Sequence, residues 1–288
     1  MVDRMEIWNQ INKDFAKAYV AIAISQLATG RPAEAGATWL RLKDVSATGH
    51  DFAAHGRADL AMYEGRLADA ATILEEALAQ PPQGRSASTT ARLTVTLADV
   101  RAAQGRTADA VKLAEQAITR SGEQSIGLLS GLVMIRAGRA QRGSEIAGDL
   151  AKKLDDEAQM FGHLLEGEAA LQREDARAAV ASFEAAQKIA KSWLGSYGLG
   201  RAYLAGGAFA QAQTEFDYCA GHAGEATTVM LDDIPTYRIM PPVSYYLART
   251  REGLNNASAA QASYKAFLAV KEKGDEQGLV ADARRRVK

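Results

Sequence analysis

The fold of this chain is set by a segment at residues 193–219, with the sequence WLGSYGLGRAYLAGGAFAQAQTEFDYC. In this segment Gly207 is followed five residues later by a small residue, Ala212, and apolar residues recur at helical spacing on both sides. A period of 33 to 40 residues between successive small residues is typical of stacked helical hairpins. The other pairs are Gly30/Ala35, Gly65/Ala70, Gly105/Ala110, Gly138/Gly143 and, in a slot without glycine, Glu174/Ala179.

Each member of the pair has its own physical role. The glycine stands where the first helix of a hairpin must end, because a chain that reverses after a helix usually needs a residue at positive φ. The small residue falls in the first turn of the second helix, where it lets the two backbones approach closely. With 47% apolar residues and prolines at the predicted unit boundaries, the chain can bury a continuous core. The sequence therefore predicts an all-α, right-handed α-solenoid of about seven hairpins.

These units resemble the tetratricopeptide repeat, a helix–turn–helix motif of about 34 residues. When Ala212 is placed at position 20 of that motif, Gly200, Tyr203, Gly207 and Phe216 fall at positions 8, 11, 15 and 24. The best repeats cover residues 51–84 and 160–220, and the earliest units match more loosely. The resemblance implies one TPR-like solenoid domain over residues 1–288, with the first helix of each hairpin on the concave face.

An irregular insert interrupts the period at residues 221–242, GHAGEATTVMLDDIPTYRIMPP. We expect it to fold over one end of the groove, with Leu231, Ile234, Tyr237 and Ile239 packed inward and its acids in water. Its polar residues raise the alternative of a metal site, but the other histidines are distant in sequence, and we expect no metal or cofactor. A terminal hairpin and closing helix should follow at residues 243–288. The polar residues in question are Cys219, which also fits a core position, His222, Glu225, Asp232, Asp233, Tyr237 and Arg238.

The part of the chain from the insert onward also resembles tetratricopeptide modules found beside bacterial eukaryotic-like serine/threonine kinases and related signalling proteins. The resemblance is carried by GEATTVMLDDIPTYRIMPPVSYYLAR at residues 224–249, SYKAFLAVKEKGDE at 263–276, LVADARRR at 279–286 and, earlier, ADLAMYEGRLADAA at 58–71. It implies an accessory domain that binds a partner or senses a ligand for a signalling protein. The kinase motifs themselves do not occur in the sequence.

Composition and motifs exclude several classes of function. A net charge of −1 without a lysine-rich tract makes nucleic acid an unfavourable partner. No nucleophile elbow, HExxH motif or P-loop is present, so we expect no enzyme activity. Asp3, Arg4 and Glu6 interrupt any apolar signal sequence at the start, and the uncharged run at 18–30 is too short to span a bilayer. We expect a soluble chain, cytoplasmic as written, without membrane insertion, or a fragment of a larger membrane-tethered protein.

The repeat register identifies the residues that should face the groove. They lie at the outward positions of successive first helices and mix aromatic side chains with both signs of charge, which suits an extended peptide. We expect the groove to be formed by Phe52, His55, Asp59, Tyr63, Arg92, Asp99, Arg136, Phe161, Glu168, Gln172, Leu194, Tyr197 and Arg201.

Three functional hypotheses follow from this architecture. The leading one is a non-catalytic protein-interaction scaffold that binds a peptide or helix of a protein partner in the concave groove. The second is a ligand-sensing regulatory domain of a bacterial signalling protein such as a serine/threonine kinase, with the insert at residues 221–242 as a lid. The third is self-association through an exposed solenoid end.

Overall fold

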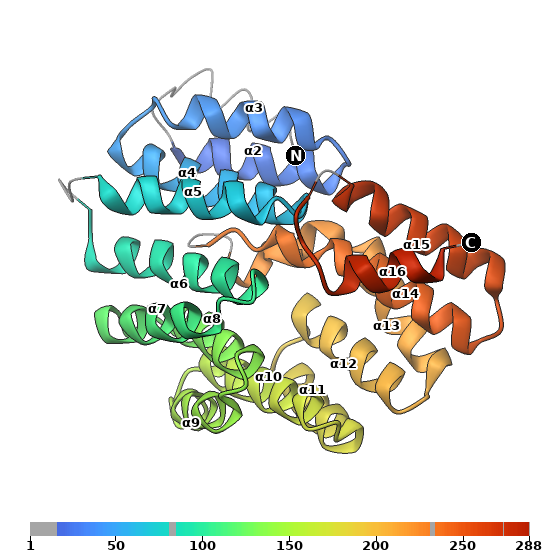
Figure 1. The fold of residues 1–288 in the computed structure, drawn as a ribbon. Coiled ribbons are helices and arrows are strands. Elements are labelled where there is room, and N and C mark those ends of the chain that lie inside the picture. The colour runs from blue at the N-terminus through green and yellow to red at the C-terminus, as the bar shows by residue number, and fades with distance from the viewer. Residues whose placement is uncertain (1–15, 81–84, 231–233, 273, 288) are drawn as a thin grey trace.

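Helical hairpins follow one another along the part of the chain that the structure, a computed structural model, describes: residues 16–80, 85–230, 234–272 and 274–287. No strand occurs within these residues, and the all-α solenoid predicted from the sequence is confirmed (Figure 1). The first helices of the seven hairpins are α2 (Ala16–Ala28), α4 (Ala47–Tyr63), α6 (Ala87–Ala103), α8 (Gln124–Arg136), α10 (Asp156–Gln172), α12 (Trp193–Ala205) and α14 (Pro241–Gly253). The second helices are α3 (Pro32–Leu42), α5 (Leu67–Ala79), α7 (Thr107–Arg120), α9 (Ala140–Ala151), α11 (Ala176–Ile189), α13 (Phe209–Gly221) and α15 (Ala257–Lys271), and α16 (Leu279–Arg286) follows them.

The turn inside each hairpin has the backbone conformation that the repeat predicts. The glycines at 30, 65, 105, 138 and 207 have φ between 72° and 78°. Glu174 adopts the same conformation at φ 60°, and the amide of Asp175 donates a hydrogen bond to the carbonyl of Ala170 at 2.9 Å, as in a Schellman turn. Asn255, at φ 59°, supplies the corresponding turn of the last hairpin, which the glycine spacing does not reveal.

Glycines inside the first helices make room for aromatic rings of the second helices. A methyl group on Gly167 would lie 2.7 Å from the ring of Phe183, and one on Gly200 would lie 2.7 Å from the ring of Phe216. Both rings are fully buried, as is Ala212 in the first turn of α13. The glycine, alanine and aromatic positions of the repeat therefore act together to bring the helices of a hairpin into close contact.

The hairpins close into a ring, because the N-terminal hairpin packs against the C-terminal half of the chain. Leu27 of α2 and Trp39 of α3 share a buried cluster with Trp193 of α12, Phe216 of α13 and Val243 of α14. On the other side a second cluster extends from α6 to α12. Figure 1 shows the blue N-terminal helices beside the orange and red C-terminal ones. Parts of both solenoid ends are thus engaged within the chain.

A loop between α15 and α16 fastens this closure to the turn between α4 and α5. The amide groups of Asp275 and Glu276 donate hydrogen bonds to the carbonyl of Gly65 at 2.9 and 3.1 Å. The carboxylate of Asp275 accepts hydrogen bonds from the amides of Leu67 and Ala68 at 2.6 and 3.2 Å. Since α5 has no capping side chain of its own, a residue about two hundred positions away caps its N-terminus.

The insert is more ordered than its sequence suggests. It contains two 3₁₀ helices, η1 (Ala223–Met230) and η2 (Tyr237–Ile239), and α14 begins at Pro241 instead of at residue 243 because proline fits the first turn of a helix. Ile234 and Tyr237 are buried, as expected. Leu231, Asp232 and Asp233, for which we predicted positions in the insert, and Asp3, Arg4 and Glu6 lie outside the described residues. Among the helices described, none has the length and apolar character needed to cross a bilayer.

Candidate functional site

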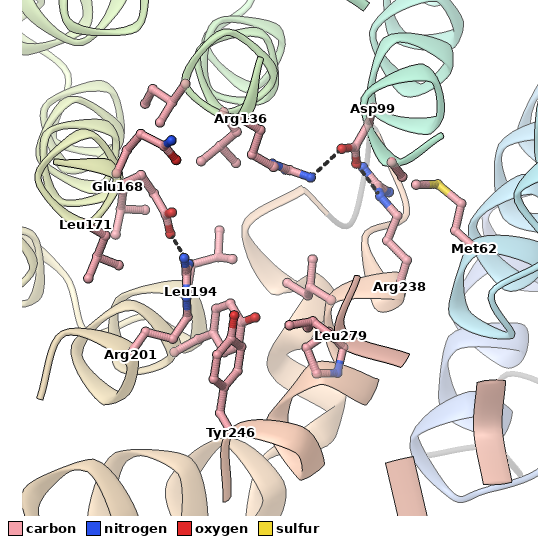
Figure 2. Close-up of a pocket in the computed structure, with 18 of the residues that line it drawn as sticks. Met62, Asp99, Arg136, Glu168, Leu171, Leu194, Arg201, Arg238, Tyr246 and Leu279 are labelled. Atoms are coloured by element: carbon pink, nitrogen blue, oxygen red, sulfur yellow. Dashed lines mark hydrogen bonds and ion pairs between the residues drawn. The ribbon is translucent and has the colours of Figure 1, made fainter. Parts of the chain in front are cut away.

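A cavity of about 360 Å³ lies between the concave faces of the central hairpins, the segment containing η2 and the C-terminal helices. In Figure 2 side chains from opposite walls point into it, with Arg136 and Glu168 on one side and Tyr246 and Leu279 on the other. Its walls therefore combine segments that are far apart in the sequence. The lining residues belong to α4, α5, α6, α8, α10, α11, α12, α14, α15, α16, η2 and the loop before α16.

Most of the cavity wall is aliphatic. Leu132, Leu171, Leu194 and Leu279 are only half-buried, so part of each side chain faces the space inside. These side chains come from α8, α10, α12 and α16, which places apolar surface on several sides of the cavity. The other aliphatic lining residues are Met62, Leu67, Ala103, Leu128, Ile135, Leu164, Ile239 and Pro242.

Arg238 of η2 anchors the insert to the concave face through two buried carboxylates. Its Nη1 donates a hydrogen bond to Asp59 Oδ1 at 3.0 Å, and its Nε donates one to Asp99 Oδ2 at 2.8 Å. Arg136 shares the second acid, because its Nη1 donates to Asp99 Oδ1 at 2.7 Å. The side chains of Asp59, Arg238 and Asp99 are at most 5% exposed. The side chain of Arg136 is 50% exposed.

A second ion pair lies in another part of the wall. Arg201 of α12 donates a hydrogen bond from Nη1 to Glu168 Oε1 of α10 at 2.5 Å. Its guanidinium also lies over the rings of Tyr197 and Tyr246, with centroid distances of 5.4 and 5.7 Å, in cation–π contact. Tyr197 is in turn stacked on Trp193 at 5.4 Å. The ion pair and the contacts with two aromatic rings therefore hold the Arg201 guanidinium in one orientation.

Burial and ion pairing shift the ionisation of these groups in different directions. Burial favours the neutral form of Asp99, but Arg136 and Arg238 outweigh it and lower the pKa of this carboxyl. At Asp59 burial outweighs Arg238 and raises the pKa. For Arg201 burial opposes the charge, but Glu168 and the adjacent tyrosines raise the pKa of the guanidinium. Two arginines of the wall, Arg201 and Arg238, thus remain cationic at neutral pH.

The structure brings together about half of the residues that the sequence assigned to the groove. Within the described chain, Asp99, Arg136, Glu168, Gln172, Leu194, Tyr197 and Arg201 line the central cavity. Their part in binding a partner stays a prediction.

The other expected groove residues are covered or used elsewhere. Phe161 was expected to be exposed on the concave face, and this prediction is wrong. The side chain is fully buried, because it packs in the hydrophobic cluster that extends from α6 to α12. Asp59 lies beneath Arg238, and the ring of Tyr63 packs on that of Tyr237 at 5.5 Å. The remaining three are Phe52, which packs against the N-terminal core, Arg92, which pairs with Glu123 at 2.9 Å, and His55, which is 2% exposed.

His55 differs from the other covered residues because its buried ring nitrogens are unpaired within the described part of the chain. Neither ring nitrogen has a hydrogen-bond partner among the described residues. Burial, together with the nearby positive charges of Arg92, Arg238 and Arg85, lowers the pKa of His55 to about 3. The imidazole is therefore neutral at physiological pH, and it is held in a position where a positive charge would be strongly disfavoured.

Sequence reasoning missed the wall that comes from the C-terminal third. Tyr246 of α14, Lys271 of α15 and Glu276 line the cavity, and the Lys271 ammonium donates hydrogen bonds to the Met62 carbonyl at 2.8 Å and to Glu276 Oε2 at 2.7 Å. Arg238 is one of the clustered polar residues of the insert, and this cluster is the sequence feature that could have identified it as a functional residue. The expected core role of Cys219 is confirmed, since it is buried and accepts the indole hydrogen bond of Trp193 through its carbonyl at 3.0 Å.

Comparison with known proteins identifies the fold. No family model and no curated protein matches this chain. A tetratricopeptide repeat protein from Parabacteroides merdae is similar in structure over 94% of this chain and 98% of its own, with a TM-score of 0.51 and 12% identity. The APC/C hetero-tetramer Cut9–Hcn1 contains a chain that matches 100% of this one at a TM-score of 0.53 and 13% identity, and the present chain covers 52% of it. The tetratricopeptide-repeat fold expected from the sequence is confirmed.

Proposed function

We propose that this protein is a non-catalytic protein-interaction scaffold whose partner inserts a short segment into the central cavity. The observation that carries this proposal is the convergence of charged and aromatic side chains from α6, α8, α10 and α12 on one half-apolar space. A few polar groups that fix orientation, set in an apolar wall, are what a recognition pocket requires. The same fold takes part in a hetero-tetramer in Cut9–Hcn1, which agrees with an interaction role.

In this proposal the partner does not lie as an extended peptide along the whole concave face. Tyr237 and Arg238 of this chain already cover Tyr63 and Asp59, which belong to the N-terminal part of that face. A partner would have to displace a buried arginine and its two hydrogen-bonded carboxylates in order to lie there, and separating such groups is costly. A short segment that enters the central cavity needs no displacement of this kind.

The test is partner capture with a variant that narrows the cavity without disturbing the core. Gln172 lines the cavity and is exposed, so Gln172→Trp should add bulk at its edge and leave the fold intact. Arg173→Trp, at the next position, which is also exposed and lies outside the lining, is the matched control. We expect a protein captured from the native lysate by the wild type and by Arg173→Trp to be lost from Gln172→Trp. Equal capture by all three proteins would refute the cavity as the partner site.

A ligand-sensing regulatory domain is the second candidate, and closure of the cavity by the chain itself favours it. Ile239 of η2, Pro242 of α14 and Leu279 of α16 line the cavity together with residues of α6, α8, α10 and α12. A volume of about 360 Å³ falls within the range of small-molecule pockets. A ligand that binds only the folded form should raise the melting temperature in a thermal-shift panel. An association with a signalling kinase belongs to this candidate and rests on the sequence resemblance alone.

A further inference from the structure

The charged groups around the cavity differ greatly in how accessible they are. The side chain of Arg136 is 50% exposed, more than twice the exposure of any acid in the wall. The side chains of Asp99, Glu168 and Glu276 are 5%, 18% and 23% exposed. Of the charged side chains that line the cavity, that of Arg136 is therefore the most accessible to a ligand.

Among the described residues, both carboxylate oxygens of Asp99 already accept hydrogen bonds from arginines, whereas Arg136 uses only one of its nitrogens to bind Asp99. Its guanidinium carries five N–H donors, and Nη1 serves Asp99. Asp99 accepts from Arg136 at one oxygen and from Arg238 at the other, so the carboxylate is shared between two cations. The remaining donors of Arg136 match the planar, two-oxygen geometry of a carboxylate.

The other cations in the wall argue for a single negative charge on the ligand. Arg238 is 5% exposed and bound by two acids, and Lys271 is 3% exposed and bound by Glu276 and a carbonyl. Arg201 is 23% exposed and pairs with Glu168 at 2.5 Å. A dianion such as phosphate would need a second uncommitted cation beside Arg136, whereas a monocarboxylate needs only one.

The leucine-rich wall specifies the rest of the ligand. Leu132 lies on α8 with Arg136, and Leu171 lies on α10 with Glu168. Leu194 of α12 and Leu279 of α16 add apolar surface to the same cavity. Such a surface gains from contact with a hydrocarbon chain, because burial of methylene groups removes them from water.

We propose that the central cavity binds an aliphatic monocarboxylate, with its carboxylate on Arg136 and its alkyl chain along Leu132, Leu171, Leu194 and Leu279. This inference rests on the second candidate function and names its ligand class. An amphiphile with one negative end satisfies both halves of the wall. An alcohol of the same length lacks the charge for Arg136, and an alkylammonium would bring a cation to the exposed guanidinium.

The experiment compares three probes with a ten-carbon alkyl chain by calorimetric titration of the full chain, the two ionic probes below their micellar concentrations and the alcohol below its solubility limit. The probes are decanoate, decan-1-ol and decyltrimethylammonium. We expect decanoate to bind best and Arg136→Met to weaken its binding by about tenfold or more, because a charge-assisted bidentate contact is lost. Arg142→Met is the matched control, since Arg142 pairs with Glu115 at 2.8 Å outside the cavity lining and its loss should leave decanoate binding unchanged.

A cavity-filling variant, Leu132→Phe, should weaken both decanoate and decan-1-ol and so place the alkyl chain. Equal affinity for decanoate and decan-1-ol, or unchanged decanoate binding by Arg136→Met, would overturn the carboxylate assignment while the cavity still binds ligands. Preference for the ammonium probe would overturn it too. Absence of binding by all three probes would overturn the aliphatic ligand, and the capture experiment with Gln172→Trp decides the scaffold function independently.

Discussion

Acid should destabilise this protein through His55, and the size of the effect follows from its burial. The perturbation is a change from pH 7 to pH 4.5 in the wild type and in His55→Leu. Because burial and the facing arginines Arg85, Arg92 and Arg238 lower the folded-state pKa of His55 to about 3, the folded protein keeps this imidazole neutral at both pH values. The unfolded chain has an ordinary histidine pKa of about 6.5 and takes up the proton.

Proton linkage determines whether stability rises or falls with pH. A lowered folded-state pKa means that the unfolded state binds more protons, so the free energy of unfolding falls as the pH drops below about 6.5 and levels off only near the folded-state pKa of about 3. Over the interval from pH 7 to 4.5 the loss is about 2.5 kcal/mol, and a folded-state pKa one unit higher would change it little. Asp51 and Asp59, one turn away on α4 in either direction, are present in both proteins, so their contributions cancel to first order in the comparison.

The assay is urea unfolding at several pH values for both proteins, with His163→Asn as control. His163 is half-buried on α10, where it pairs with Glu166 at 3.1 Å, so its replacement controls for the loss of a histidine at another position. His55→Leu should be no less stable than the wild type at pH 7, because it removes two unpaired ring nitrogens. Parallel pH profiles for wild type and His55→Leu would refute the reasoning. If the variant fails to fold, an NMR titration of His55 in the wild type decides, and a pKa near 6.5 would be the refuting value.

Three further predictions concern the turns, the ring closure and the insert. Glu174→Gly should raise the free energy of unfolding by about 1 kcal/mol, because it relieves a non-glycine residue at positive φ, and Glu174→Ala should not, as urea unfolding of both variants will show. Asp275→Ala should lower thermal stability by about 1 kcal/mol through loss of the α5 cap, while Gln277→Ala should not, and equal melting temperatures for the two variants would contradict the cap. Arg238→Met should cost about 3–5 kcal/mol at pH 7, because it leaves Asp59 and Asp99 without their shared partner, and the deficit should shrink in acid as those carboxyls protonate; a pH-independent deficit would point to packing instead.

How far the sequence predicted the site depends on how local each feature is. Asp99, Arg136, Glu168, Tyr197 and Arg201 could be placed on the inner face because the repeat register assigns each first-helix position to a side of the helix. The same register placed Phe161 on that face, where the structure has it fully buried. Register gives the direction of a side chain from its own helix, but it does not say whether another segment covers it.

The sequence by itself determined the hairpins. Their turns depend on a backbone conformation that glycine adopts without strain, and Glu174 could be recognised as the exception because the period required a turn there. Asn255 is the turn residue of the last hairpin, but it does not belong to the glycine pattern. It was identified only from its positive φ in the structure. Local steric rules of this kind act over a few residues, which is why they can be read from the chain.

Only the tertiary structure decided that the array closes on itself and encloses a cavity. Closure depends on the accumulated rotation between neighbouring hairpins, and small differences in packing at each contact change where the last hairpin arrives. The contacts that result join residues far apart in the chain: Arg238 meets Asp99 across 139 positions and Lys271 meets Met62 across 209. No local rule connects such pairs, so the cavity, its accessible arginine and its leucine wall emerge only when the whole chain has folded.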